Sequence, residues 1–243
     1  MSARLRLKLH DQHGHPRLTP VLVERLRTAI EAEREATLVT LESDGGVFCS
    51  GMDLGELRSV DGNVPDALER FAGLLRDVAC TPRPVIALVG GPAMGGGVGL
   101  AAAADLVLAT RHATFGLPEA LFGLVPAMVF PVLARRVGPA RARWMALGAT
   151  TISATEAWRI GLVDEVVDDL ESALARHARI IDCLDARAVA EVKALSVVYE
   201  DATAPYRAHA TDSFAHLLAT AGTRDRIDRF LSGGTPWPEG GAT

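Results

Sequence analysis

Six glycines within ten residues constrain the fold of this chain more than any other feature. Residues 85–100 begin with the apolar run Val-Ile-Ala-Leu-Val, pass through these glycines and continue into an alanine-rich run. Glycine has no Cβ, so backbone N–H groups beside it can come close to a ligand. A helix that begins there directs unpaired N–H groups and its positive dipole end at the same point. The segment predicts a strand, a turn that can hold a negatively charged oxygen, and a buried helix.

Composition narrows the class of protein. A chain of 243 residues with 49% apolar and 23% charged residues is typical of a soluble globular protein. The net charge of −5 argues against nucleic acid as a partner. Cys49, Cys80 and Cys183 have neither disulfide-framework nor metal-ligand spacing, and no apolar run is long enough to span a membrane. We therefore expect a cytoplasmic protein without a metal site or a membrane partner.

Hydrophobic periodicity divides the chain into two regions. Leu5, Leu7 and Leu9 alternate with polar residues, as in an edge strand. Further strands are predicted at 37–43, 47–54, 85–89, 105–110 and 113–115. Helices are predicted at 20–30, 67–78, 129–136, 140–147, 154–160, 170–181, 186–198, 205–219 and 223–231, the last capped by Thr223. Strands alternate with helices in the first half and helices alone fill the second, so we expect an α/β core (1–185) and a C-terminal helical region (186–243).

Two predicted strands end in glycine turns, at Gly51-Met52 and at residues 95–97. If the strands are neighbours, both turns open on the same edge of the sheet. Two backbone N–H groups that converge from such turns can form an oxyanion hole. An acid follows in an apolar context, Phe-Gly-Leu-Pro-Glu119, where desolvation would raise its pKa toward neutrality.

The series of motifs resembles the crotonase superfamily, the enoyl-CoA hydratases and isomerases, over nearly the whole chain. The matching pieces are residues 48–54, 91–97, 104–105, 113–119 and 152–163, in the family's order and spacing. The resemblance implies a ClpP-like spiral of ββα turns with a C-terminal α-helical trimerisation layer, assembled as a homotrimer or a dimer of trimers. It also implies an acyl thioester substrate, on coenzyme A or on the phosphopantetheine of an acyl carrier protein, and no other cofactor.

The same resemblance assigns roles to individual residues. The N–H groups of Met52 and Gly96 would stabilise the enolate oxygen of the thioester, and Glu119 would be the catalytic acid and base. Hydratases of this family carry a second glutamate where this chain has Gly99, so the two-acid arrangement for hydration is incomplete. A single carboxylate suits isomerisation or syn elimination, and we expect Gly99 to leave space for a branched substrate. Asp53 is a candidate assisting or bracing residue.

A narrower resemblance selects one reaction. Residues 122–127 (Phe-Gly-Leu-Val-Pro-Ala), the Gly-Met-Asp form of residues 51–53 and the terminal Gly-Thr-Pro-Trp (234–237) are similar to the dehydratases of polyketide β-branching cassettes. That similarity implies dehydration of 3-hydroxy-3-methylglutaryl-acyl carrier protein to the 3-methylglutaconyl thioester. A CoA-dependent hydratase or Δ3,Δ2-isomerase is the first alternative, and a non-catalytic acyl-thioester binding protein is the second.

Other interpretations of the glycines and acids stay open at this point. The glycine run could serve close packing alone, and residues 97–102 also match the dinucleotide pattern GxGxxA, although inside the predicted helix. Glu119 could cap a helix or pair with an arginine, and Glu56 is a weaker second acid. Asp53 beside a glycine turn more often braces its own loop.

The remaining candidates have ordinary interpretations. His10, His13 and His15 lie in a turn-rich segment and fit a solvated loop better than a metal site. Cys49 fits a buried filler at a strand end. Trp144, Met145 and Trp158 have core-like spacing and are expected to pack inside the protein. The candidates to bind a substrate carboxylate are Arg58, Arg83 and Arg136, although surface solvation is expected for each.

Overall fold

The computed structural model describes residues 3–11, 13–59, 64–197 and 204–236. Its larger sheet has five parallel strands in the order β1, β2, β3, β5 and β8. In the smaller sheet, β6 pairs parallel with β4 and antiparallel with β7. The strands are β1 (Arg4–Lys8), β2 (Leu38–Glu42), β3 (Val85–Val89), β4 (Ala93–Met94), β5 (Leu106–Thr110), β6 (Thr114–Gly116), β7 (Thr151–Ser153) and β8 (Glu165–Val167).

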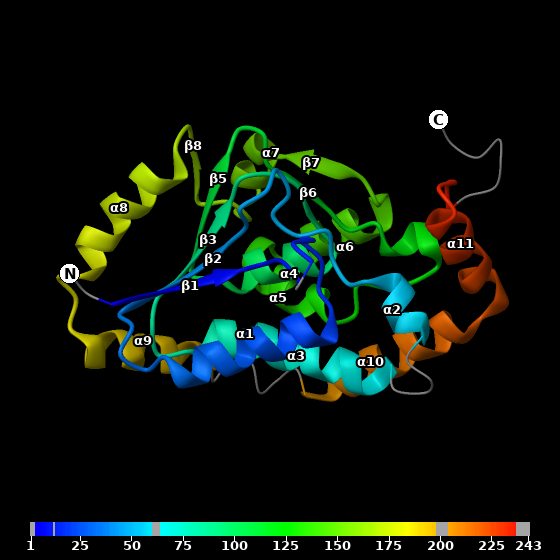
Figure 1. The fold of residues 1–243 in the computed structure, drawn as a ribbon, viewed down its shortest axis with the longest axis horizontal. Coiled ribbons are helices and arrows are strands. Elements are labelled where there is room, and N and C mark those ends of the chain that lie inside the picture. Colours follow the sequence, from blue (N-terminus) through cyan, green and yellow to red (C-terminus); the bar gives the residue numbers. More distant parts are fainter. Residues whose placement is uncertain (1–2, 12, 60–63, 198–203, 237–243) are drawn as a thin grey trace.

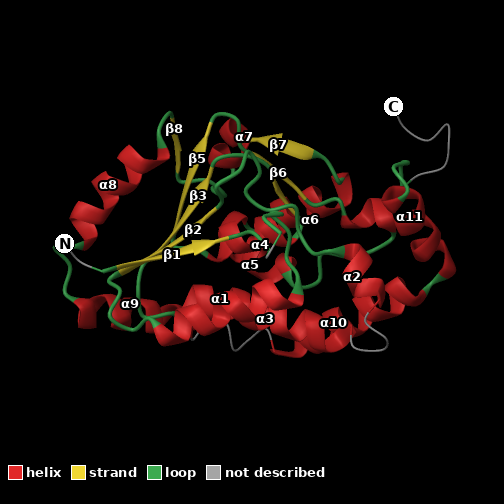
Figure 2. Cartoon of the chain, viewed as in Figure 1, coloured by secondary structure: helices red, strands yellow, loops and turns green. Residues whose placement is uncertain are grey.

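Helices cover both faces of the larger sheet. In Figure 1, α8 lies on one side of the strands, and α1, α3 and α9 run along the other. Figure 2 shows the helices that follow α9 extending away from the sheet toward α2. The α-helices are α1 (Pro20–Ala32), α2 (Leu54–Ser59), α3 (Val64–Cys80), α4 (Gly96–Ala103), α5 (Val129–Val137), α6 (Pro139–Gly148), α7 (Ala154–Arg159), α8 (Leu170–Ile181), α9 (Ala186–Val197), α10 (Ala204–Ala219) and α11 (Ala221–Leu231). A 3-10 helix, η1, spans Glu119–Phe122.

The central strands are formed by short, mostly apolar runs of sequence. All five residues of β2 and of β3 are buried, as in a parallel sheet that is covered on both faces. In β3, Ile86 and Leu88 face the smaller apolar cluster beneath α8, whereas Val85, Ala87 and Val89 face the main core. The predicted edge strand is confirmed, since β1 pairs only with β2 among the described strands. The sheet therefore directs the C-terminal end of β3 into the glycine turn.

Two segments differ from the prediction. The strand predicted at residues 47–54 is not formed. This segment pairs with its neighbours only through two isolated β-bridges, Cys49 with Ala93 and Met52 with Leu18. The second half is not purely helical, since β7 extends the small sheet and β8 closes the large one. Both late strands have only three residues, too few to show a periodic pattern.

The helix caps follow the sequence at most positions. Thr19 Oγ1 accepts the N–H of Leu22 at the start of α1, and Ser153 Oγ accepts the N–H of Glu156 in α7. The predicted cap of the last helix is wrong, because Thr220 caps α11 and accepts the N–H of Thr223. Thr223 lies in the first helical turn and is buried.

The C-terminal helices pack on the same chain's core. Lys193 of α9 is buried and donates to both carboxylate oxygens of Asp105 at 2.7 and 2.6 Å, which fixes α9 near the start of β5. The prediction that both tryptophans pack in the core is wrong: Trp144 is 67% exposed and Trp158 is 54% exposed, whereas Met145 is buried. Among the described residues, no helix has both the length and the apolar character needed to cross a membrane.

Candidate active site

Two glycine turns meet beyond the C-terminal end of β3. The backbone before Gly51 runs beside β4, where Met94 N donates to Cys49 O at 2.8 Å. Gly51 has a φ of +89°, and a Cβ added there would lie 3.0 Å from Met94 O and 3.5 Å from Gly96 N. Only glycine fits so close an approach in this backbone conformation. The structure therefore brings the predicted turns together.

The N–H groups of Met52 and Gly96 are available to a ligand. In the bridge with Leu18, Leu18 N donates to Gly51 O and Asp53 N donates to Leu18 O, so the N–H of Met52 takes no part. Gly96 is the first residue of α4, where N–H groups have no partner within the helix. No hydrogen bond between described residues occupies either group. Two free donors from different turns match the arrangement of an oxyanion hole.

The Glu119 carboxylate lies beside these donors. Gly95 has a φ of +51°, and a Cβ added there would lie 3.0 Å from Glu119 Oε1 and 4.0 Å from Gly51 Cα. Pro118 precedes η1 and places Glu119 at the first position of this short helix. The residue is partly exposed as a whole, but its Oε2 is buried and has no hydrogen-bond partner within the described structure. Burial raises the pKa of this carboxyl from 4.5 to about 7.

A cavity of about 650 Å³ opens in front of these groups. Met52, Gly95, Gly96 and Glu119 line it, and most of its remaining wall is apolar. The apolar lining includes Leu68, Phe71, Met94, Leu121, Phe122, Leu124, Val125, Met128, Val129, Phe214, Phe230 and Leu231. Such a cavity can hold an acyl chain next to one carboxylate and two N–H donors.

Asp53 braces the rim of the cavity. Its Oδ1 accepts the N–H groups of Gly55 and Glu56, and its Oδ2 accepts Arg17 Nη1 at 2.8 Å. Burial by itself would raise the pKa of Asp53, but these hydrogen bonds and the charge of Arg17 outweigh it and hold the pKa below its usual range. Asp53 therefore stays ionised, and both of its carboxylate oxygens already have hydrogen-bond partners. Glu56 does not line this cavity, although burial raises its pKa.

The expectation that Gly99 leaves space for substrate is wrong. Gly99 is buried in α4, and a Cβ there would lie 3.0 Å from Val129 Cγ2 and 3.4 Å from Leu75 Cδ2. Neighbouring side chains therefore occupy the space where a side chain at position 99 would lie, and Gly99 itself does not line the cavity. The position cannot hold a second acid without displacing Val129 or Leu75.

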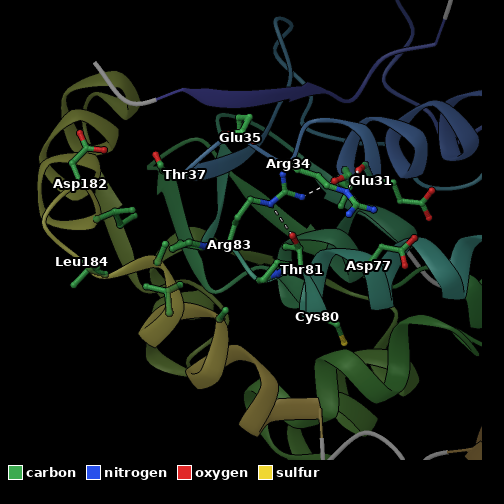
Figure 3. A pocket seen from close by; sticks show the side chains of 18 residues that line it. Glu31, Arg34, Glu35, Thr37, Asp77, Cys80, Thr81, Arg83, Asp182 and Leu184 are labelled. Atoms are coloured by element: carbon green, nitrogen blue, oxygen red, sulfur yellow. Dashed lines mark hydrogen bonds between the residues drawn. The ribbon is translucent and has the colours of Figure 1, made fainter.

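Arg83 and Arg136 are neither solvated nor near the candidate site. Arg83 donates to the carbonyls of Glu33 and Ile30 at the end of α1, and lines a separate cavity of about 680 Å³ before the start of β3 (Figure 3). Arg136 donates to the carbonyls of Leu162 and Ala104. Both guanidinium groups are bound to backbone carbonyls of the fold. The side chain of Arg58 lies outside the described residues.

The other candidates take ordinary roles in the fold. Cys49 is fully buried, and burial raises the pKa of its thiol to about 12. His13 and His15 are exposed. Within the described ranges, no group of three or more histidine, cysteine or acidic side chains is arranged to hold a metal. The GxGxxA match lies inside α4, and Glu119 follows no strand directly, so the dinucleotide interpretation has no structural support.

Sequence reasoning missed the parts of the site that come from distant segments. Arg17, from the N-terminal loop, and Phe214, Phe230 and Leu231, from the last two helices, line the cavity. No local pattern marks them, because helical periodicity shows an apolar face without showing what that face covers. In Figure 1, α2 and α11 lie on the same side of the molecule, and Leu231 lies near Gly55 of α2.

Comparison with known proteins agrees with this geometry. Residues 5–239 match the sequence model of the enoyl-CoA hydratase/isomerase family. The chain belongs to this family. A solved family member, a putative polyketide biosynthesis enoyl-CoA hydratase from Bacillus subtilis, superimposes with a TM-score of 0.88 at 25% identity, over 98% of this chain and 96% of that one. The crotonase fold predicted from the sequence is therefore confirmed.

Two curated family members show different kinds of similarity. A probable enoyl-CoA hydratase from Rhodobacter capsulatus is 40% identical over 157 residues, which are 63% of this chain and 61% of that protein. The bacillaene synthase dehydratase PksH of Bacillus subtilis is 29% identical over 239 residues, 96% of this chain and 92% of that protein. The first three curated relatives are matched over only 55% to 66% of their length.

Proposed function

We propose that this family member is a hydro-lyase that dehydrates a 3-hydroxyacyl thioester, with 3-hydroxy-3-methylglutaryl-acyl carrier protein as substrate and the 3-methylglutaconyl thioester as product. One observation carries the proposal: a single buried carboxylate, Glu119, lies beside two free N–H donors in an apolar cavity. The nearly full-length similarity to a protein named as a dehydratase supports it.

The geometry accounts for each step of a syn elimination. The thioester oxygen accepts the N–H groups of Met52 and Gly96, which stabilise the negative charge that develops when the α-carbon loses its proton. Ionised Glu119 takes that proton. The bond from Cβ to the hydroxyl then breaks, and the now neutral Glu119 gives the proton to the leaving hydroxide, so that water departs and the carboxylate is regenerated.

The pKa of Glu119 suits both halves of this cycle. With a pKa of about 7, the group is partly ionised at neutral pH and loses or gains a proton at little cost. Asp53, the other carboxylate that lines the cavity, is bound to Arg17 and held ionised, so it is not a second acid. The packed volume beside Gly99 leaves no room for one in α4.

We also propose that the chain assembles as a homotrimer or a dimer of trimers. Trp144 and Leu147 of α6 and Trp158 of α7 expose large apolar surfaces that an isolated chain would leave in water. Analytical ultracentrifugation of the wild type and of a Trp144→Glu variant tests this proposal. A wild type that sediments as a monomer at micromolar concentration would contradict it.

The test of function is intact mass spectrometry of the carrier protein. Purified enzyme mixed with 3-hydroxy-3-methylglutaryl-acyl carrier protein should remove one water, and Glu119→Gln should slow this loss by about 10² to 10⁴-fold. Glu171→Gln, the same change at an exposed position of α8, should leave the rate unchanged. A fully active Glu119→Gln variant would refute the assignment of the acid and base.

The same assay, extended to CoA esters and to the ultraviolet absorbance of the conjugated enoyl thioester, separates the alternatives. The similarity to the probable enoyl-CoA hydratase of Rhodobacter capsulatus supports a CoA-dependent hydratase as the alternative. Such an enzyme would convert the 3-hydroxyacyl-CoA ester and leave the carrier-bound substrate unchanged. A Δ3,Δ2-isomerase would move a double bond in an enoyl-CoA without a change of mass. A non-catalytic binding protein would retain the thioester and convert neither form.

A further inference from the structure

The last helix of the chain holds the turn that carries Glu119. Arg226 Nη1 donates to Leu121 O at 3.1 Å, and Thr223 Oγ1 donates to Gly123 O at 3.3 Å. Both acceptors are backbone carbonyls of η1 or of the glycine that ends it. The donors come from α11, about a hundred residues later in the chain. These bonds join the two segments directly.

Close packing accompanies the hydrogen bonds. The rings of Phe122 and Phe230 meet edge to face with centroids 5.1 Å apart. Gly123 has a φ of +78°, and a Cβ there would lie only 2.7 Å from Thr223 Oγ1. Helix α11 therefore lies against the turn with no intervening space.

The turn has little support of its own. η1 has only four residues, and 3-10 helices have poor hydrogen-bond geometry, so such short segments are easily displaced. Its local backbone bonds run from Leu121 N to Pro118 O, from Gly123 N to Ala120 O and from Leu124 N to Glu119 O. The orientation of the Glu119 side chain at its first position therefore depends on what packs against the turn.

We propose that Arg226 is a positioning residue for Glu119: from α11 it fixes η1 so that the carboxylate stays beside Gly95, with Oε2 buried. The proposal rests on the proposed role of Glu119 as acid and base. Arg226 and Thr223 are not among the residues that line the cavity, whereas Phe230 and Leu231 are. A change at Arg226 therefore acts on catalysis through the turn and leaves the substrate contacts in place.

The deciding variant is Arg226→Met, which keeps an unbranched, flexible side chain and removes the guanidinium donors. Displacement of the turn should lower kcat about 10²-fold with little change in KM, because small errors in the placement of a catalytic group are costly. Arg226→Lys, which keeps a donor, should recover part of the loss. Arg224→Met, at an exposed position of the same helix, should behave as wild type.

A second readout does not depend on turnover. The ¹³C resonance of the Glu119 carboxyl, assigned by its loss in Glu119→Gln, should titrate near pH 7 in the wild type. In Arg226→Met it should titrate at lower pH, because a looser turn lets water reach the carboxylate. If wild type converts no thioester but this titration still moves in Arg226→Met, the proposed reaction fails and the positioning role stands.

Two results would overturn the positioning role. One is a folded Arg226→Met protein with wild-type kcat and wild-type titration of Glu119. The other is equal loss in Arg226→Met and Arg224→Met, which would indicate a general weakening of α11. If Arg226→Met does not fold, Thr223→Val, which removes the bond to Gly123 O, supplies the same two measurements.

Discussion

The buried carboxylate of Glu119 should make the protein less stable as pH rises, and Glu119→Gln should remove this effect. The folded state raises the pKa of the group from 4.5 to about 7, so between these values the folded chain holds a proton that the unfolded chain has released. The group's contribution to stability is therefore complete below pH 4.5 and is lost as pH rises through about 7. Above pH 7 the carboxylate is ionised while its Oε2 is buried with no hydrogen-bond partner in the described structure.

The size of the effect follows from the two pKa values. Above both, one such group costs about 3 kcal/mol of the free energy of unfolding. Between pH 5 and pH 8 the expected loss is about 2 to 3 kcal/mol, because part of the cost is already present at pH 5. This is a large fraction of the 5 to 15 kcal/mol that stabilises an ordinary domain. The catalytic acid is thus expected to be maintained at the expense of stability.

Urea denaturation at pH 5, 6, 7 and 8 measures the effect. The difference in the free energy of unfolding between Glu119→Gln and wild type should grow with pH and favour the glutamine variant most at pH 8. Asp169→Asn is the matched control, since hydrogen bonds from Ser172 lower the pKa of Asp169 and its contribution should stay constant above pH 5. A wild-type curve parallel to that of Glu119→Gln from pH 5 to 8 would refute the claim that Glu119 is desolvated.

Three further predictions test the packing around the site. Gly95→Ala should fold but lose most activity in a kcat/KM assay, because its Cβ would lie 3.0 Å from Glu119 Oε1 at a positive φ; full activity would contradict the proposed geometry. Gly99→Glu should lower Tm sharply, by burying a charge at a cost of about 3 kcal/mol or more, and should not create a hydratase. Iodoacetamide at pH 8 should label exposed Cys183 and spare buried Cys49 in the folded protein, as peptide mass spectrometry would show.

Glycine turns were the part of the site that the sequence could predict. A glycine at a close approach leaves a local mark, and Gly51 and Gly95 both have the positive φ that explains why no other residue stands there. The apolar context of Glu119 likewise predicted its desolvation, and the apolar residues near it in the chain, such as Leu117 and Phe122, are buried. Local chemistry was enough for these features.

Features that depend on contacts between segments far apart in the sequence were not predictable. The spacing of Trp144 marks one face of α6 but does not show whether the chain itself covers that face. Arg136 looks solvated in the sequence, yet its long side chain reaches backbone carbonyls 26 and 32 residues away. The contact between Arg226 and Leu121 spans 105 residues and has no local signal.

The glycine run shows that structural and catalytic interpretations need not compete. Gly91 and Gly97 serve close packing, since a Cβ would lie 1.9 Å from Gly46 O at the first and 2.6 Å from Cys49 O at the second. Those close approaches hold residues 46–49 against the turn, and so place Gly51, the residue before Met52, beside Gly96. Gly95 and Gly96 line the cavity. Substitution at the packing glycines should therefore reduce folding and activity together, whereas substitution at Gly95 should reduce activity in a folded protein, and this difference separates the two roles within a single motif.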